Sequence, residues 1–224
     1  MTIALVVITD GRDCVHQTIP SALAMLDGGI TERWLYDDSG DELHTAALRS
    51  KYQPHGFRVF NHPGGRQGFG GANRYVRDVL AEQSDTDLIF WLEDDFTFQR
   101  EVPLHRMATV LRINAHLAQI CLLRQPWNDT EKAAGGIVHA NPGDYLDRRD
   151  VFGNRWLEHR RCYSTNPHLF RHGLLHIPWP DVEHSEGVYT HQLLELGYRF
   201  AYWGDRYAEP AVHHIGTERA GSGY

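Results

Sequence analysis

Three of the apolar runs in the first half of this 224-residue sequence end in acidic residues. Residues 3–8 are followed by Asp10, residues 33–36 by the acidic sequence DDSGDE, and residues 88–92 by three consecutive acids. A short apolar run bounded by charge is typical of a buried strand. In an open α/β sheet, ligands bind outside the carboxyl ends of the strands. The pattern therefore predicts such a sheet, with a ligand site at its acidic edge.

Helix-like segments separate the strand-like ones, which is the pattern of an α/β fold with a largely parallel sheet. Strands are expected at residues 3–9, 33–36, 57–60, 88–92, 119–123, 168–177 and 199–203. Helices are expected around residues 19–26 and 43–51, after the glycine-rich loop as far as Ala81, and at residues 103–117 and 186–196, the last closed by Gly197. Residues 128–165 form a long polar stretch with few periodic signals, and a loop of that length is usually functional or partly structured.

Composition excludes several classes of protein. Hydrophobic residues make up 42% of the chain and charged residues 23%, which is ordinary for a globular protein and argues against disorder. The formal net charge of −7 disfavours general nucleic-acid binding. The longest early apolar run is too short for a signal peptide or a membrane span. Cys14, Cys121 and Cys162 are odd in number and widely spaced, which argues against a disulfide framework or a zinc site, so a cytoplasmic location is expected.

The sequence FWLEDDFTF, residues 90–98, places Glu93, Asp94 and Asp95 between apolar and aromatic neighbours. Three carboxylates crowded at the end of a buried strand repel one another. A positive partner is therefore expected, and the candidates are a hard divalent cation, an arginine or shared protons.

A glycine-rich loop, NHPGGRQGFGGANR, precedes the third expected helix. A Rossmann fingerprint would follow the first strand and read GxGxxG, and a P-loop would contain Gly-Lys-Ser or Gly-Lys-Thr, so the loop fits neither. It can still present backbone N–H groups and Arg66 to an anion. The alternative is a plain flexible turn.

Five segments, taken in order, resemble the signatures of GT-A glycosyltransferases, especially glycosyltransferase family 2. They are ITDGRD after the first strand, YDDSGDE after the second, the loop ending GGANR, FWLEDDF, and the C-terminal SEGVYTHQLLELGYRFAYWGD followed by VHHIG. The resemblance covers nearly the whole chain and is weakest in residues 128–165. It implies a GT-A fold, α/β with a mostly parallel central sheet flanked by helices. It also implies a single domain of residues 1–224, in which residues 1–98 bind the nucleotide-sugar and residues 99–224 bind the acceptor.

The resemblance also implies which residues bind the donor. It places Thr9, Asp10 and Arg12 beside the nucleotide base, with Asp38 accepting a hydrogen bond from the ring N–H. A carboxylate in that position suits uracil, so a UDP-sugar is the expected donor. The further donor-binding residues are expected to be Arg66, Asn73, Glu93 and Asp94.

A metal ion and a base complete the implied site. Asp95, the last acid of the motif, is expected to bind Mn²⁺ or Mg²⁺ bridging the donor diphosphate. A second ligand would be His214 or His213, of which only one can face the site, because neighbours in an extended segment point to opposite sides. An inverting transfer needs a base for the acceptor proton, and Glu186 is the candidate with Glu183 in reserve.

The leading hypothesis is a metal-dependent, inverting glycosyltransferase that moves a sugar from a nucleotide-sugar to an acceptor hydroxyl. A nucleotidyltransferase of related architecture is an alternative, but it would carry a longer glycine-rich loop with a lysine after the first strand, where this chain reads TDGRDC. A non-catalytic sugar- or metal-binding module is the third possibility.

The acceptor is unknown, although one stretch bears on it. The sequence RRDVFGNRWLEHRR, residues 148–161, holds five arginines against two acids in an otherwise acidic chain. Such charge often only solvates a loop. The functional interpretation is an anionic acceptor, such as a phosphorylated lipid, an anionic glycan or a modified nucleic acid.

Overall fold

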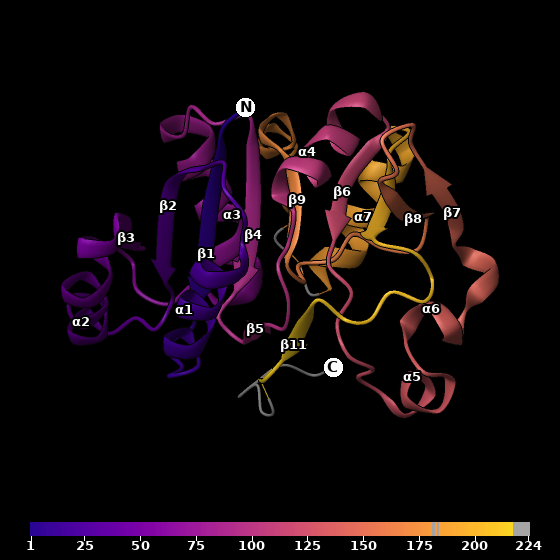
Figure 1. Cartoon of the computed structure of the whole chain (residues 1–224). Helices are drawn as coiled ribbons and strands as arrows, with labels where there is room; N and C mark the ends of the chain where they lie inside the picture. Colours follow the sequence, from indigo (N-terminus) through magenta and orange to yellow (C-terminus); the bar gives the residue numbers. More distant parts are fainter. Residues whose placement is uncertain (181, 183, 217–224) are drawn as a thin grey trace.

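The computed structural model describes residues 1–180, 182 and 184–216, and within them nine strands form one large sheet (Figure 1). The strand order across this sheet is β3-β2-β1-β4-β9-β6-β10-β8-β7, and β11 and β5 form a separate pair. The strands are β1 Ile3–Thr9, β2 Ile30–Asp37, β3 Phe57–Asn61, β4 Leu88–Glu93, β5 Phe96–Phe98, β6 Leu117–Cys121, β7 Leu146–Arg149, β8 Arg155–His159, β9 His168–Arg171, β10 Arg199–Trp203 and β11 Val212–His214.

The sheet is mostly parallel, as the sequence predicts. β1 pairs in parallel with β2 and β4, β2 with β3, and β6 with β10, whereas β9 lies antiparallel between β4 and β6. β8 is antiparallel to both β10 and β7, so among the described residues β8 and β9 are the strands that run against the rest. The carboxyl ends of β1, β2, β4, β6 and β10 therefore lie along one edge.

Helices cover both faces of this sheet. They are α1 Val15–Met25, α2 Glu42–Tyr52, α3 Gly68–Gln83, α4 Leu104–Ile113, α5 Asp129–Ala134, α6 Ile137–Ala140 and α7 Ser185–Glu195, with short 3₁₀ turns η1 Gln53–His55, η2 Pro142–Asp144 and η3 His172–His176. α1, α2 and α4 pack on one face with Leu5 and Val7 of β1. α3, η3 and α7 pack on the other face with Ala4 and Val6. Because both faces are covered, β1 and β4 are apolar along nearly their whole length and become polar only at their carboxyl ends.

The expected elements of the first half are confirmed to within a few residues. Local signals explain the boundaries: Asp41 caps α2 by accepting a hydrogen bond from the N–H of Leu43 at 2.8 Å. At the other end of the chain, α7 is followed by Gly197 with a φ of 90°, a conformation that glycine adopts without steric cost.

Three expectations for the second half are wrong in their bounds. The helix expected at residues 103–117 ends at Ile113, and Leu117 already begins β6, because the apolar residues that follow the helix continue as a buried strand. The strand expected at residues 168–177 ends at Arg171 and becomes the turn η3. The stretch 128–165 is not one loop, since it contains α5, α6, η2 and the hairpin of β7 and β8.

Two buried histidines make the stability of this fold depend on pH. Burial lowers the pKa of His159 to about 4 and that of His168 to about 3. His168 is satisfied as a neutral ring, with its Nδ1 2.7 Å from the carbonyl oxygen of Asn166 and its Nε2 2.7 Å from the hydroxyl of Tyr163. Both side chains are therefore held neutral in the folded state.

Acid should destabilise the protein through these histidines. Between about pH 6.5 and pH 4 the unfolded chain binds a proton at His159 that the folded chain does not, so the free energy of unfolding falls as pH falls. His159→Phe keeps an aromatic ring against Tyr202 but cannot bind a proton. Between pH 7 and pH 5 we expect the free energy of unfolding of this variant to fall by about 2 kcal/mol less than that of the parent protein, measured by urea unfolding. The exposed His55 provides the control variant, His55→Phe, and an equal change there would contradict the assignment.

No helix among the described residues is long and apolar enough to cross a membrane. The cysteines at positions 14, 121 and 162 are all free thiols, in agreement with the absence of a disulfide framework predicted from their spacing.

Candidate active site

Arg12 is the positive partner of the buried acids at the end of β4. Its guanidinium forms ion pairs with Asp95 at 2.9 Å, with Asp10 at 2.6 Å and with Asp94. Asp94 and Asp95 are 1% and 0% exposed, so both carboxylates are removed from water. An arginine is thus the partner in the structure, and it comes from the loop that follows β1, the strand paired beside β4.

Burial dominates the electrostatics of Asp94. It raises the pKa of this carboxyl to about 7, although Arg12 and the hydroxyl of Thr9 act in the opposite direction. The Thr9 hydroxyl donates a hydrogen bond to Asp94 at 2.6 Å, and the hydroxyl of Thr18, in α1, donates to the Asp94 backbone carbonyl. Arg12 therefore relieves the repulsion between the acids, and burial favours the protonated form of Asp94.

His214, and not His213, faces this cluster. β11 pairs antiparallel with β5, which places His214 opposite Phe96, directly after the acids. The Nε2 of His214 lies 3.1 Å from the Oδ2 of Asp95, while His213 is exposed on the other side of the strand. The N–H of Ile215 donates to the backbone carbonyl of Asp95 at 2.7 Å and fixes the end of β11 against the site.

Gly216 closes the site from the C-terminal side. A Cβ atom at this position would lie 2.5 Å from the Oδ2 of Asp95 and 3.1 Å from a terminal nitrogen of Arg12. Real Cβ atoms essentially never approach that closely, and the buried Asp95 carboxylate is held by two partners. The cluster thus requires a glycine at this point.

We expect Gly216→Ala to displace Asp95 and to lower the free energy of unfolding by about 1–3 kcal/mol, the usual cost of overpacking a close contact. Urea unfolding measures this change. Gly187→Ala on α7 is the matched control, since a Cβ at Gly187 meets no atom within 4 Å. Equal free energies of unfolding in the two variants would show that Gly216 does not shape the site.

The glycine-rich loop is anchored by Asp38. Its two carboxylate oxygens accept hydrogen bonds from the backbone N–H groups of Gln67 and Gly68, each at 2.8 Å, and the hydroxyl of Tyr36 donates a third at 2.9 Å. Asp38 is 4% exposed. In this structure the carboxylate holds the start of α3 beside the carboxyl end of β2, and its contact with a nucleotide base stays a prediction.

The other expected donor-binding residues lie at different depths. Arg66 is half exposed on the glycine-rich loop, with one guanidinium nitrogen 3.8 Å from Asp10. Glu93 is the last residue of β4 and is 8% exposed. Asn73 is buried inside α3, where its amide donates to the carbonyl of Phe69 at 2.8 Å, and its contact with the donor stays a prediction.

Glu186 lies at the start of α7, beyond the carboxyl end of β6. Its Oε1 accepts hydrogen bonds from the backbone N–H of Thr165 at 2.7 Å and from the Thr165 hydroxyl at 2.9 Å. His184, directly before this helix, has a φ of 58°, and among the described residues it is the single non-glycine with a positive φ. Backbone strain of this kind clusters at functional sites. Glu183 lies outside the described residues.

Several contributors to the site were not found from the sequence. Tyr36 could have been, because it lies two residues before Asp38 and therefore on the same side of an extended chain. Thr18, Thr165 and Gly216 carry no local signal, since each acts only through a long-range contact.

The donor set fits a metal ion that also binds the substrate. A carboxylate oxygen of Asp95 and an imidazole nitrogen of His214 converge; the carboxylate suits Mn²⁺ or Mg²⁺, and the imidazole favours Mn²⁺ over the harder Mg²⁺. The described residues contain no group of three side chains able to hold a metal by themselves. Magnesium-like ions typically use one or two protein ligands and complete their shell with phosphate oxygens and water, so the two donors suffice only with a diphosphate present.

Comparison of the sequence with protein-family models gives no match, and comparison with curated proteins also gives none. Comparison of the structure does give matches. GalNAc-T7, in a structure with UDP, GalNAc and Mn²⁺, is similar with a TM-score of 0.67 at 11% identity, over 96% of this chain and 44% of that one. TarS from S. aureus, residues 1–349 with UDP-GlcNAc, gives 0.64 at 16% identity, over 99% of this chain and 60% of that one.

A third match belongs to another class of enzyme. CMP:2-keto-3-deoxy-manno-octonic acid synthetase with CTP has a TM-score of 0.54 at 13% identity, over 91% of this chain and 89% of that one. At such low identities a likeness shows the fold alone, and it confirms the predicted GT-A fold. This chain spans less than two thirds of the GalNAc-T7 and TarS chains.

Proposed function

We propose that this chain is a glycosyltransferase that moves a sugar from a UDP-sugar to an acceptor hydroxyl with inversion, aided by Mn²⁺ or Mg²⁺. The observation that carries the proposal is the cluster of Arg12, Asp94, Asp95 and His214 at the carboxyl ends of β1 and β4. The loop anchored by Asp38 lies beside it. The GT-A neighbours whose structures contain UDP, Mn²⁺ or UDP-GlcNAc support this choice of donor.

The protein groups have separate tasks in this proposal. Asp95 and His214 hold the metal ion, which when bound neutralises charge on the departing diphosphate. Arg12 keeps the buried acids ionisable and ordered until the donor binds. At the start of α3 the N–H of Gly68 already donates to Asp38, so Arg66 on the same loop is the group that we assign to the anionic donor.

The proton of the acceptor hydroxyl needs a base on the opposite face of the sugar. We assign this role to Glu186, because its helix starts beside the first turn of α3. The hydroxyl oxygen of Ser185 lies 3.9 Å from the point where a Cβ of Gly70 would be. Thr165 holds the carboxylate in one orientation. In this proposal, a donor bound at the glycine-rich loop has Glu186 on the side of the sugar from which the acceptor hydroxyl attacks.

Nucleotidyl transfer is the second candidate, favoured by the likeness to the synthetase over 89% of its length. Activation of a sugar with a nucleoside triphosphate would demand cationic groups for three phosphates. The loop after β1 offers Arg12, which is already shared among three carboxylates. This charge balance favours a diphosphate donor.

Product analysis separates the candidates. The protein is incubated with Mn²⁺, a panel of nucleotide-sugars, and in parallel with CTP or UTP plus sugars. Release of UDP from a UDP-sugar is the expected result. Release of pyrophosphate would instead establish the nucleotidyltransferase, and saturable UDP-sugar binding without any turnover in the presence of a broad acceptor mixture would favour a binding module.

Asp38→Asn tests how the acidic residue at the end of β2 contributes to nucleotide binding. Because the carboxylate accepts from two loop N–H groups, we expect the amide to loosen the loop and to weaken UDP and GDP alike, by about 10-fold, the cost of one or two charge-assisted hydrogen bonds. Calorimetry with both nucleotides decides the matter. A loss confined to UDP would show instead that Asp38 contacts the uracil ring, as the family resemblance implies.

A further inference from the structure

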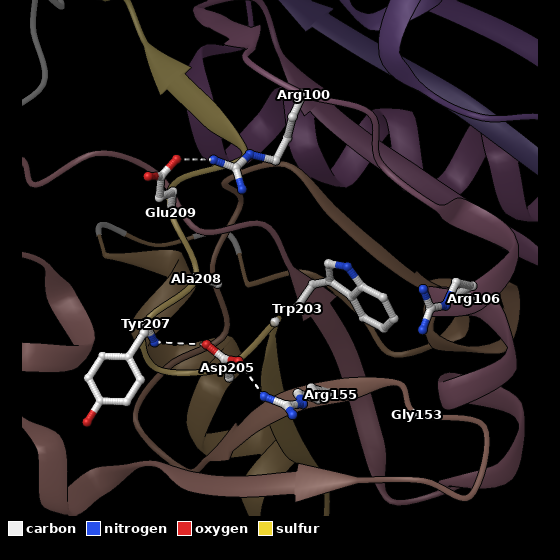
Figure 2. A pocket seen from close by; sticks show the side chains of 10 residues that line it. Arg100, Arg106, Gly153, Arg155, Trp203, Asp205, Tyr207, Ala208 and Glu209 are labelled. Atoms are coloured by element: carbon white, nitrogen blue, oxygen red, sulfur yellow. Dashed lines mark hydrogen bonds and ion pairs between the residues drawn. The ribbon is translucent and has the colours of Figure 1, made fainter.

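A pocket lies apart from the acid cluster, on the face of the sheet that carries α4 (Figure 2). Its volume is about 570 Å³, within the range of small-molecule sites. Its wall is built from the start of α4, the turn between β7 and β8, the end of β10 and the loop that leads to β11. The charged and aromatic side chains that line it are Arg100, Arg106, Arg155, Trp203, Asp205, Tyr207 and Glu209.

Two of the three arginines are in ion pairs that a ligand can replace. Arg100 contacts Glu209 at 2.8 Å, with the side chains 44% and 82% exposed, and Arg155 contacts Asp205 at 2.8 Å, with 53% and 33% exposed. Exposed pairs of this kind contribute little to stability. An anion that binds two N–H groups of an arginine in the bidentate manner can therefore compete with them.

Arg106 has unused donors. Its Nε donates to the side-chain oxygen of Asn154 at 2.6 Å, which fixes the guanidinium beside the ring of Trp203, 6.0 Å from the ring centroid. Within the part of the chain that the structure describes, its two terminal nitrogens form no hydrogen bond. Three arginines against two acids leave the lining with one excess positive charge in a chain whose net charge is −7.

Trp203 gives the pocket a flat surface. It is the last residue of β10 and only partly buried, with one side packed on the core that includes α4. Its indole N–H donates to no described residue. Figure 2 shows the ring in the middle of the pocket, with Arg106 beside it and Arg155 below. An aromatic face next to guanidinium groups suits a sugar ring that carries an anionic group.

We propose that this pocket binds an anionic sugar, with the sugar ring on Trp203 and its phosphate or carboxylate on Arg106 and Arg155. This goes beyond the proposed function, because the glycine-rich loop and α7 pack on the opposite face of the sheet. The loop from Glu209 to His214 joins the two places and spans at most about 17 Å when extended. The pocket can therefore hold a part of a larger ligand that also reaches the acid cluster.

The test uses the full chain labelled with ¹⁵N, observed through the indole and arginine Nε–H signals. Glucose 6-phosphate, glucuronate, glucose and inorganic phosphate are titrated separately. We expect glucose 6-phosphate or glucuronate to shift the signals of Trp203 and Arg106 saturably, with an affinity at least about 10-fold above that of glucose or phosphate alone. Equal affinity for inorganic phosphate, or no saturable shift with either anionic sugar, would overturn the proposal.

Variants locate the site. Arg106→Gln should lower the affinity for the anionic sugar about 10-fold, because one bidentate contact is lost. Arg112→Gln is the matched control, since Arg112 is an exposed arginine of the same helix outside the pocket. Equal losses in both variants would place the binding elsewhere. UDP titrations of the same samples measure binding at the proposed donor site. A failure of anionic-sugar binding in the pocket can therefore be told apart from a failure of UDP binding at the donor site.

Discussion

Asp95→Asn is expected to abolish metal-dependent UDP binding while leaving the fold intact. The substitution keeps the size of the side chain but removes the charge from the carboxylate that contacts His214. Arg12 still has Asp10 and Asp94 as partners, so the buried guanidinium is not left without an anion. We expect the affinity for UDP in the presence of Mn²⁺ to fall by at least about 100-fold, which is about 2.7 kcal/mol. Affinity without metal should change little, and calorimetry measures both.

The two adjacent histidines provide a matched control for this prediction. His214→Gln should reproduce most of the loss, because His214 is the second group that converges on Asp95. His213→Gln should not, since that side chain is exposed on the other side of β11. Undiminished Mn²⁺-dependent binding in Asp95→Asn, or equal losses in the two histidine variants, would contradict the assigned metal ligands.

The fold was largely predictable because its central strands are buried on both faces. β1 and β4 appear in the sequence as uninterrupted apolar runs, and each stops where its strand reaches the edge of the sheet. Such runs are strong local signals. β7 gave no such signal, because all four of its residues are exposed at the end of the sheet. The sequence therefore predicts a loop where the structure has the antiparallel hairpin of β7 and β8.

The site was predictable in its location but not in its contacts. The acids at three strand ends indicated the edge, and parallel strands brought them together. The ion pairs of Arg12 cross from residue 12 to residues 94 and 95, and a contact over that distance in the chain has no local pattern. Similarly, the acidic sequence DDSGDE indicated a turn but could not show that Asp38 holds the glycine-rich loop.

The arginine-rich stretch 148–161 shows most clearly what could not be predicted from the sequence alone. Its charge suggested an anionic ligand, but the sequence did not separate its members. In the structure Arg148 and Arg161 contact Glu158 and Asp144, whereas Arg155 lines the pocket beside Trp203. Fold geometry thus divides one charged segment into structural ion pairs and a candidate binding group.

Glu186→Gln is expected to have the largest effect on the reaction itself. The glutamine amide keeps one oxygen to accept the two hydrogen bonds from Thr165, so the orientation of the side chain is preserved. Its other terminal atom is an NH₂ group, which cannot take a proton from the acceptor hydroxyl. Sugar transfer should therefore fall by about 10²- to 10⁴-fold, the usual contribution of a general base. UDP and Mn²⁺ affinities should stay within a few-fold, because the donor site is not altered.

Two further variants decide which carboxylate acts and how it is held. Thr165→Val removes the hydroxyl but leaves the backbone N–H, so we expect a smaller loss of kcat, with the pH at half-maximal rate displaced because a hydrogen bond to the carboxylate is gone. A Glu183→Gln variant that loses transfer while Glu186→Gln retains it would assign the base to Glu183. The anomeric configuration of the product tests the role of the base independently. Inversion requires a base opposite the leaving diphosphate. A product that retains the donor configuration would rule out this role for Glu186.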